Sequence, residues 1–142
     1  MKTTEEMWAL MKDHLGYTNE QMRLFKEDPK NDIIISKAPE LMQKTIVVEV
    51  VESHGCNSQH KVGTCFYLDG AGNFITKLCP KRMCTFLVGS ISGMVFGMHE
   101  LFYAGVDPNE LKFRRTGCFD VGVQCGGWGR VVVDIRMEDR KS

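Results

Sequence analysis

The residues that could do chemistry in this chain of 142 residues are six cysteines and four histidines. Cys56 and His60 form a C-x3-H pair in a polar loop that should follow a strand. Cys79 lies where the chain should pass into a helix, and Cys118 follows an expected strand near the C-terminus. All four positions are ends of elements, where a fold can bring distant residues together. Three thiolates and one imidazole suit zinc in tetrahedral geometry, so the pattern predicts a zinc site.

Two alternatives to zinc stay open. Iron or an iron–sulfur cluster is the other possible occupant, because both accept thiolate and imidazole ligands, although no two cysteines have C-x2-C spacing. The thiols could instead be buried and inert, since free cysteine packs as a small hydrophobe. That interpretation fits Cys65, within an expected strand, better than Cys56, whose neighbours Gly55, Asn57 and Ser58 offer little apolar cover.

Further residues could complete or tune the site: His54, Cys84, Asp120 and Cys125. His54 and Asp120 are candidates for an outer shell that orients the imidazole ligand. Cys84 and Cys125 are alternative ligands or resolving thiols. Cys79, at the start of the expected helix, would be favoured as a thiolate by the unpaired N–H groups there. This property suits a metal ligand and equally a reactive nucleophile.

The segment from Thr45 to Met137 resembles a family of small, largely uncharacterised bacterial and archaeal proteins. Its members share a C-x3-H-x-V-G element, a Cys before a helix and a late Cys-x-Asp, which here read Cys56–Gly63, Cys79-Pro80 and Cys118-Phe119-Asp120. The resemblance implies that a set of residues acts together, namely Cys56, His60, Cys79, Cys118, Gly63 and Asp120. The chain departs from the family at Phe119, where many members have Pro, and in the added Cys125-Gly126-Gly127-Trp128. The resemblance implies no particular reaction.

The elements that must position these residues begin with a helical arm over residues 1–44. Thr3 with Glu6, and Thr18 with Gln21, have the spacing of a capping box. Gly16 is a natural end for the first helix. A polar stretch, 26–31, should close the second helix, and a short third helix is expected over residues 39–44.

From residue 45 to residue 142 the pattern changes to that of a sheet. Runs rich in Val, Ile and aromatic residues predict strands over 45–53, 65–68, 74–77, 111–116 and 130–137. The second and third runs flank a turn and should form a hairpin. Cys79-Pro80 should open a helix that runs to Tyr103. The order predicts an α+β fold, a small mixed or antiparallel sheet with one central helix, preceded by the N-terminal helical arm.

Net charge and hydropathy indicate which kinds of partner and which location to expect for the chain. Eighteen basic and eighteen acidic side chains give a net charge of zero, so we expect no nucleic-acid partner. Residues 85–98 are uncharged, but a bilayer needs about 20 apolar residues, so we expect a core helix and no membrane. The N-terminus shows no basic segment followed by an apolar one, so we expect a cytoplasmic protein, where cysteines more often bind metals than form disulfides.

Self-association is expected through the N-terminal helices or through one helix face. Gly89, Gly93 and Gly97 recur every four residues, a spacing that lets another backbone approach closely. Packing of this helix on the sheet is the other interpretation. The basic cluster Lys112, Arg114 and Arg115 is expected on a solvated edge strand.

These observations predict a metal-binding cytoplasmic protein with an accessory or interaction role. One alternative is a metal-dependent enzyme that acts on a small molecule, if the metal keeps an open position. An apolar pocket beside His54 or Asp120 would favour that alternative. Another is a thiol redox protein in which Cys79 attacks and Cys84 or Cys125 resolves.

Overall fold

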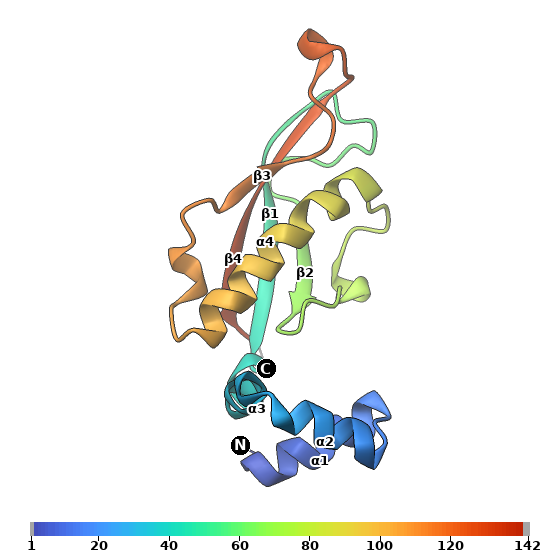
Figure 1. The fold of residues 1–142 in the computed structure, drawn as a ribbon. Coiled ribbons are helices and arrows are strands. Elements are labelled where there is room, and N and C mark those ends of the chain that lie inside the picture. The colour runs from blue at the N-terminus through green and yellow to red at the C-terminus, as the bar shows by residue number, and fades with distance from the viewer. Residues whose placement is uncertain (1, 141–142) are drawn as a thin grey trace. The chain divides into compact units, whose positions relative to one another are not determined.

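The computed structural model describes residues 2–140, and the chain divides into two compact units between Gln43 and Lys44. The first unit holds α1 (Thr4–Leu15), α2 (Asn19–Glu27) and α3 (Pro29–Leu41). The second holds, in order, β1 (Lys44–His54), β2 (Cys65–Asp69), η1 (Thr76–Leu78), α4 (Thr85–Tyr103), η2 (Pro108–Glu110), β3 (Arg115–Gly117), η3 (Val123–Cys125) and β4 (Arg130–Asp139) (Figure 1). All strand pairs are antiparallel. The predicted α+β fold with an N-terminal helical region is confirmed.

The first two helices begin and end where their capping residues predict. The Thr3 hydroxyl accepts a hydrogen bond from the N–H of Glu6 at 3.2 Å. Thr18 and Gln21 form a complete capping box, with each side chain bonded to the backbone of the other. Gly16 ends α1 in the left-handed conformation, at φ 69°. These local bonds satisfy backbone groups that the ends of a helix leave unpaired.

The third helix is longer than predicted. It begins at Pro29, with Asp28 as its N-cap: the carboxylate accepts from the N–H of Lys30 at 2.9 Å. The prediction that the polar stretch 26–31 closes the second helix is confirmed, since α2 ends at Glu27. The prediction of a new helix over 39–44 is wrong, because α3 already spans Pro29–Leu41. Proline fits the first helical position because its φ is already helical and its missing N–H would be unpaired there. Pro39, expected at a helix start, lies inside α3.

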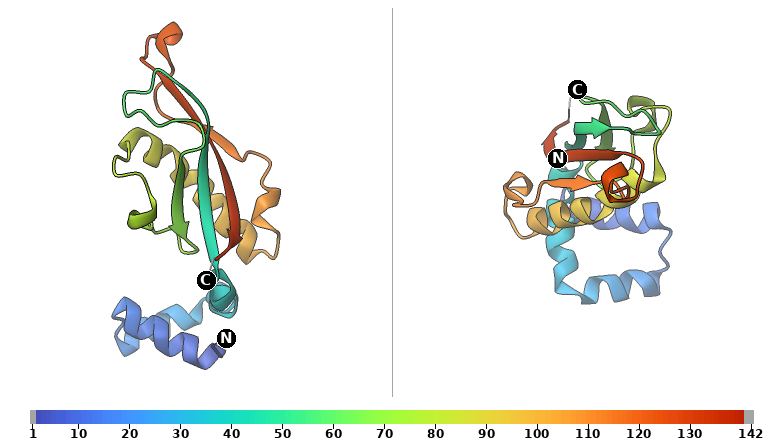
Figure 2. Two further views of the ribbon diagram at one scale, coloured as in Figure 1. Left: turned by 180° about the vertical axis from the view of Figure 1, so that it is seen from behind. Right: turned by 90° about the horizontal axis from the view of Figure 1, so that it is seen from above.

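The sheet of the second unit has the order β2-β1-β4-β3. Val48 stands at its centre, paired with Phe66 on β2 and Ile135 on β4. Alternate residues of the three longer strands are buried on one face, and α4 crosses that face (Figures 1 and 2). The buried residues of α4 are Leu87, Ile91, Met98 and Phe102. The core of this unit is thus the single layer between α4 and the sheet.

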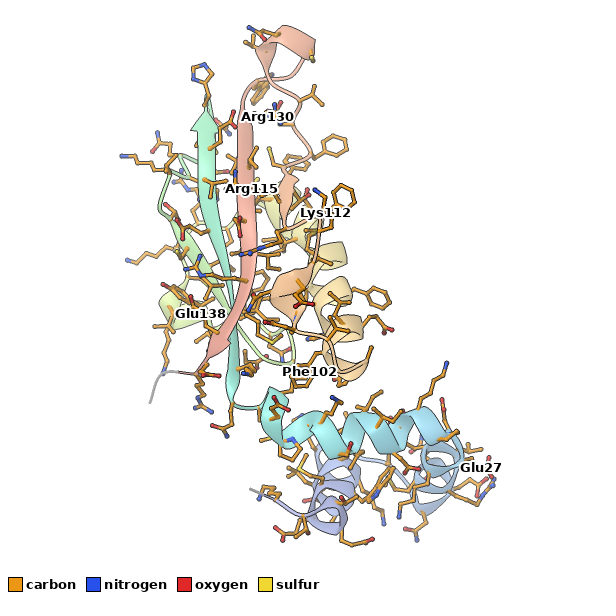
Figure 3. All side chains as sticks on the ribbon, turned by 90° about the vertical axis from the view of Figure 1, so that its left-hand side faces the viewer. Glu27, Phe102, Lys112, Arg115, Arg130 and Glu138 are labelled. Atoms are coloured by element: carbon orange, nitrogen blue, oxygen red, sulfur yellow. The ribbon has the colours of Figure 1, made fainter. Side chains whose placement is uncertain are left out.

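The other face of the sheet carries charged side chains. Arg136 on β4 is bonded to Glu49 on β1 at 2.9 Å and to Glu138 at 2.6 Å, and these two carboxylates raise its pKa, Glu138 first. Figure 3 shows Glu138 and Phe102 on opposite sides of the sheet. Residues of a strand point alternately to its two faces, and a polar face opposite the buried one is typical of an antiparallel sheet with one side in solvent.

The hairpin predicted after β2 does not form a second strand. Leu68 and Phe74 make one isolated bridge, and the chain then enters η1. The Asp69 carboxylate accepts from the N–H of Asn73 at 2.9 Å, which closes the turn but does not extend the ladder. The strand predicted over 111–116 is likewise shorter and lies further along the chain, at Arg115–Gly117, where it pairs with β4.

The outer face of α4 is apolar but is not one continuous glycine stripe. A Cβ added to Gly89 or Gly93 would meet no atom within 4 Å, whereas one on Gly97 would touch Leu111 at 3.6 Å. Gly97 therefore faces the protein and the other two face outward, with Phe86 and Phe96. Among residues 2–140, α4 is the one helix long and apolar enough to cross a membrane, a criterion that the core helices of soluble proteins also meet.

Candidate metal centre

Two loops meet at one end of the sheet. The first, which we call the Cys56 loop, spans residues 55–64 after β1, and the second, the Asp120 loop, spans residues 118–129 before β4. They lie side by side in Figures 1 and 2. Gly129 makes the contact: a Cβ there would collide with the carbonyl oxygen of Gly55 and lie 2.7 Å from that of His54. Only glycine allows this approach of backbone to backbone.

The two loops and the start of α4 enclose a cavity of about 130 Å³. Four potential metal donors line it: Cys56 and His60 from the Cys56 loop, Cys84 from the start of α4, and Cys118 from the Asp120 loop. The apolar part of the remaining wall is formed by Phe86, Leu87, Trp128 and Val131, and the polar part by Asn57, Ser58, Asp120 and Arg130. Three of the four ligands predicted from the sequence therefore share one cavity. The fourth donor in the cavity is Cys84, which the sequence offers only as an alternative ligand.

His60 is the most buried donor, with 4% of its surface exposed. Its ring stands edge-on to Phe66, with centroids 5.2 Å apart, and Ser53 donates a hydrogen bond to its backbone carbonyl. Burial, and then the positive charge of Arg82, lower the pKa of His60, so the imidazole is neutral at pH 7. Its Nε2 finds no hydrogen-bond partner within residues 2–140. A buried polar atom of this kind is costly unless something binds it.

Cys84 is the N-cap of α4. Burial disfavours its thiolate, but the N–H of Leu87, the hydroxyl of Ser58 and the N–H of Phe86 outweigh burial and lower the pKa of Cys84. The sulfur makes no capping hydrogen bond of ordinary geometry. The effect is therefore an electrostatic attraction by amide dipoles that point out of the helix. A sulfur in such a place is readily available as an anionic ligand.

Helix α4 begins five positions later than the sequence predicts. Cys79 has an extended backbone at the end of η1, and Thr85 is the first residue of the helix. A helix from Pro80 would place Lys81 and Arg82 in its first turn, where the dipole disfavours positive charge. The prediction that Cys79 begins the helix is wrong, and the charges of Lys81 and Arg82 are the signal in the sequence that points to Cys84.

Cys79 is also outside the cavity. Its sulfur accepts from the N–H of Tyr67 and donates to the carbonyl oxygen of Tyr67, both at 3.3 Å. These two bonds tie the segment before α4 to β2. They give Cys79 a structural partner on β2.

Cys118 is held within the Asp120 loop. Its N–H donates to the carbonyl oxygen of Val131 at 2.9 Å, which continues the pairing of β3 with β4. Its S–H donates to the carbonyl oxygen of Asp120 at 3.7 Å. Cys56 lines the cavity from the Cys56 loop, directly after the contact that Gly55 makes with Gly129.

The Asp120 carboxylate organises its loop. Its oxygens accept from the N–H groups of Gly122, Trp128 and Gly129, each at 2.9 Å. These amides lower the pKa of Asp120, Gly129 most strongly. A Cβ on Gly127 would collide with the same carboxylate. Asp120 lines the cavity, but its oxygens are already engaged, so it shapes the site and supplies no free base.

The remaining candidates lie elsewhere. His54 is exposed at the end of β1 and does not line the cavity. Cys125 is exposed in η3. As the side chains stand, no three His, Cys, Asp or Glu residues between positions 2 and 140 are grouped closely enough to hold an ion. The four donors of the cavity are therefore neighbours that must move closer together before they can share one ion.

Comparison of the chain with family profiles, with curated proteins and with solved structures finds no significant match.

Proposed function

We propose that this chain binds one metal ion, zinc or alternatively iron, through Cys56, His60, Cys84 and Cys118, and that it serves as an accessory or interaction protein. The observation that carries the proposal is the His60 imidazole. It is buried and neutral, its Nε2 has no protein partner in the described chain, and it shares a cavity with three free thiols. A metal ion would satisfy that nitrogen.

The donor set suits a tetrahedral ion. Zinc in structural sites is held by four ligands, most often thiolates with one or two imidazoles. Iron is the next choice for soft sulfur ligands. Two of the four donors meet a further condition for binding a metal: His60 is neutral, and Cys84 lies at a helix N-terminus, which favours the thiolate.

Binding must bring the donors inward, because they are not grouped closely enough for one ion as they stand. The free energy of metal binding is then coupled to ordering of the two loops. We expect the loaded chain to resist unfolding and proteolysis more than the metal-free chain, with the difference concentrated in the Cys56 loop and the Asp120 loop.

A binding role is favoured over metal-dependent catalysis by the state of Asp120. The apolar wall of the cavity would suit a small molecule, but the carboxylate beside it is used by three backbone N–H groups. His54, the other candidate proton carrier, is outside the cavity. A general base must be free to reach its proton, and neither residue meets that requirement.

The test is metal content after purification without oxygen and without a polyhistidine tag. We expect about one ion per chain in the unmodified protein, as a single four-ligand site requires. Cys84→Ser should lose the ion. Cys79→Ser and Cys125→Ser are matched controls, because both change one cysteine outside the cavity, and both should keep it. Metal content far below one per chain in the unmodified protein, or equal loss in all three variants, would contradict the proposal.

A further inference from the structure

Three reduced sulfurs share the cavity between the two loops. Cys56, Cys84 and Cys118 line it together, and all three are free and only partly buried. Thiols that share a small cavity can form a disulfide when an oxidant reaches them, provided that the backbone can bring their Cα atoms within about 7 Å. Which two of the three sulfurs form the disulfide then depends on the local contacts of each cysteine.

Cys84 lies beside the Cys56 loop. Ser58, two residues after Cys56, lines the cavity together with Cys84, and its hydroxyl favours the thiolate of Cys84. Cys118 differs, because its S–H and its N–H are both bonded, to Asp120 and to Val131. Cys56 follows Gly55, which has φ 66°. The local contacts therefore join Cys84 to the loop of Cys56 and hold Cys118 within its own segment.

We infer that Cys84 and Cys56 are a reactive thiol pair, which hydrogen peroxide oxidises to a disulfide in the metal-free chain. This goes beyond the proposed metal site and does not depend on it, since the reaction needs only the two sulfurs and the oxidant. His60 supports it independently. Its buried Nε2, without a partner in the described chain, lines the same cavity and can hydrogen-bond an oxygen of the peroxide.

The reaction balances in two steps. The sulfur of Cys84, at the N-terminus of α4, attacks one oxygen of the peroxide; the O–O bond breaks, the thiol proton leaves with the second oxygen, and a sulfenic acid and water result. The sulfur of Cys56 then attacks the sulfur of Cys84. The S–O bond breaks, the disulfide forms and a second water is released. Two thiols are oxidised by two electrons and one peroxide is reduced.

The experiment treats the full chain, reduced and freed of metal by a chelator, with an equal amount of hydrogen peroxide. Free thiols are counted, and disulfides are mapped by mass spectrometry of peptides. We expect two of the six thiols to be lost and the Cys56 and Cys84 peptides to be joined. Cys125→Ser should behave as the unmodified chain, and Cys84→Ser should keep Cys56 reduced. In Cys56→Ser, a sulfenic acid should accumulate at Cys84 and be captured by dimedone.

A disulfide from Cys84 to Cys118, or none at all while the thiols of Cys84 and Cys56 stay free, would overturn the inference. If a variant fails to fold, the unmodified chain still tests the inference, because dimedone should capture the sulfenic acid at Cys84 early in the reaction. A parallel sample receives zinc first. If zinc binds but leaves disulfide formation unchanged, the thiol pair stands and the proposed ligands fail. If zinc binds at one per chain and the metal-free chain forms no disulfide, the thiol pair alone fails.

Discussion

Gly129 is where the two loops touch, and it has no room for a side chain. The nearest atoms are backbone carbonyls of Gly55 and His54, which cannot turn aside as a side chain can. Gly129→Ala should therefore lower the free energy of unfolding by about 1–3 kcal/mol, the usual range for overpacking. It should also abolish metal binding, since Cys56 and Cys118 depend on this contact for their placement.

Gly89→Ala is the matched control at the same scale. An added Cβ meets open space there, and the residue lies inside α4, where glycine costs about 1 kcal/mol relative to alanine. Chemical denaturation should show this variant to be as stable as the unmodified chain or more so. If the two substitutions lower the free energy of unfolding equally, the contact between the two loops does not have the stabilising role that we assign to it.

The cysteines and the histidine proposed as ligands show how far single residues could be predicted. The placement of Cys56, His60 and Cys118 at element ends was enough to group them, because loops at one end of a sheet converge. Cys79 and Cys84 could be separated only by knowing where the helix begins. Contacts such as that of Cys79 with Tyr67 depend on tertiary structure and leave no periodic signal in the sequence.

At the scale of elements, α4 offers a way to separate folding from binding. Serine is a preferred N-cap residue, and a good N-cap stabilises a helix by about 1 kcal/mol. Cys84→Ser should thus keep or increase the unfolding free energy of the metal-free chain, yet lose the ion. The two results are measured by denaturation and by metal analysis. A variant that unfolds and loses metal together would instead mark Cys84 as a purely structural residue.

The Asp120 loop provides the second prediction at this scale. Asp120→Ala removes the acceptor for the N–H groups of Gly122, Trp128 and Gly129. Amide hydrogen exchange at these positions should become faster, while that of Val133 in the core of the sheet should not change. Glu110→Ala, an exposed carboxylate in η2, is the control. Unchanged exchange in the loop would mean that Gly127 and its neighbours keep their shape without the carboxylate.

The ends of elements were the hardest part of the fold to predict. Thr18 and Gln21 marked a helix correctly because the capping box is local. Pro29 and Pro39 could each begin a helix by local rules, and the fold uses the first as a start and buries the second within α3. The run at 74–77 has the composition of a strand, but its pairing with β2 stops after Ile75, whose N–H donates to the carbonyl oxygen of Tyr67, because the chain enters η1 at Thr76.

For the whole molecule, the division between Gln43 and Lys44 places every proposed ligand in the second unit. A fragment of residues 44–142 should therefore fold and bind the ion with the same stoichiometry as the full chain. Circular dichroism and metal analysis of the fragment would test this. Folding without metal uptake would show that the first unit contributes to the site.

Self-association remains our expectation at this scale, through the first three helices or the outward face of α4. Phe96, which is 66% exposed, stands on that face with Gly89 and Gly93. Phe96→Glu should reduce the sedimentation coefficient if this face joins two copies. A fragment of residues 44–142 that sediments as a monomer, with Phe96→Glu unchanged, would assign the contact to the helices.

The fold class as a whole followed from the order of the patterns, with helices first and then strands around one apolar helix. Val- and Ile-rich runs were sufficient to predict β1 and β4, but not which residues of β1 face α4, because Ile46, Val47 and Val48 are all buried. The strand order β2-β1-β4-β3 was not predictable, because the pairing of β1 with β4 joins the two ends of the second unit.

At Gly55 and Gly129 the loops of the candidate site meet through main-chain atoms. Mutation at either position is therefore strongly constrained, because an added Cβ would meet backbone atoms of the other loop. Descendants of such a chain can exchange the groups around the cavity without rebuilding its frame. The preference of the site for one metal over another can then evolve without a change in the fold of the two loops.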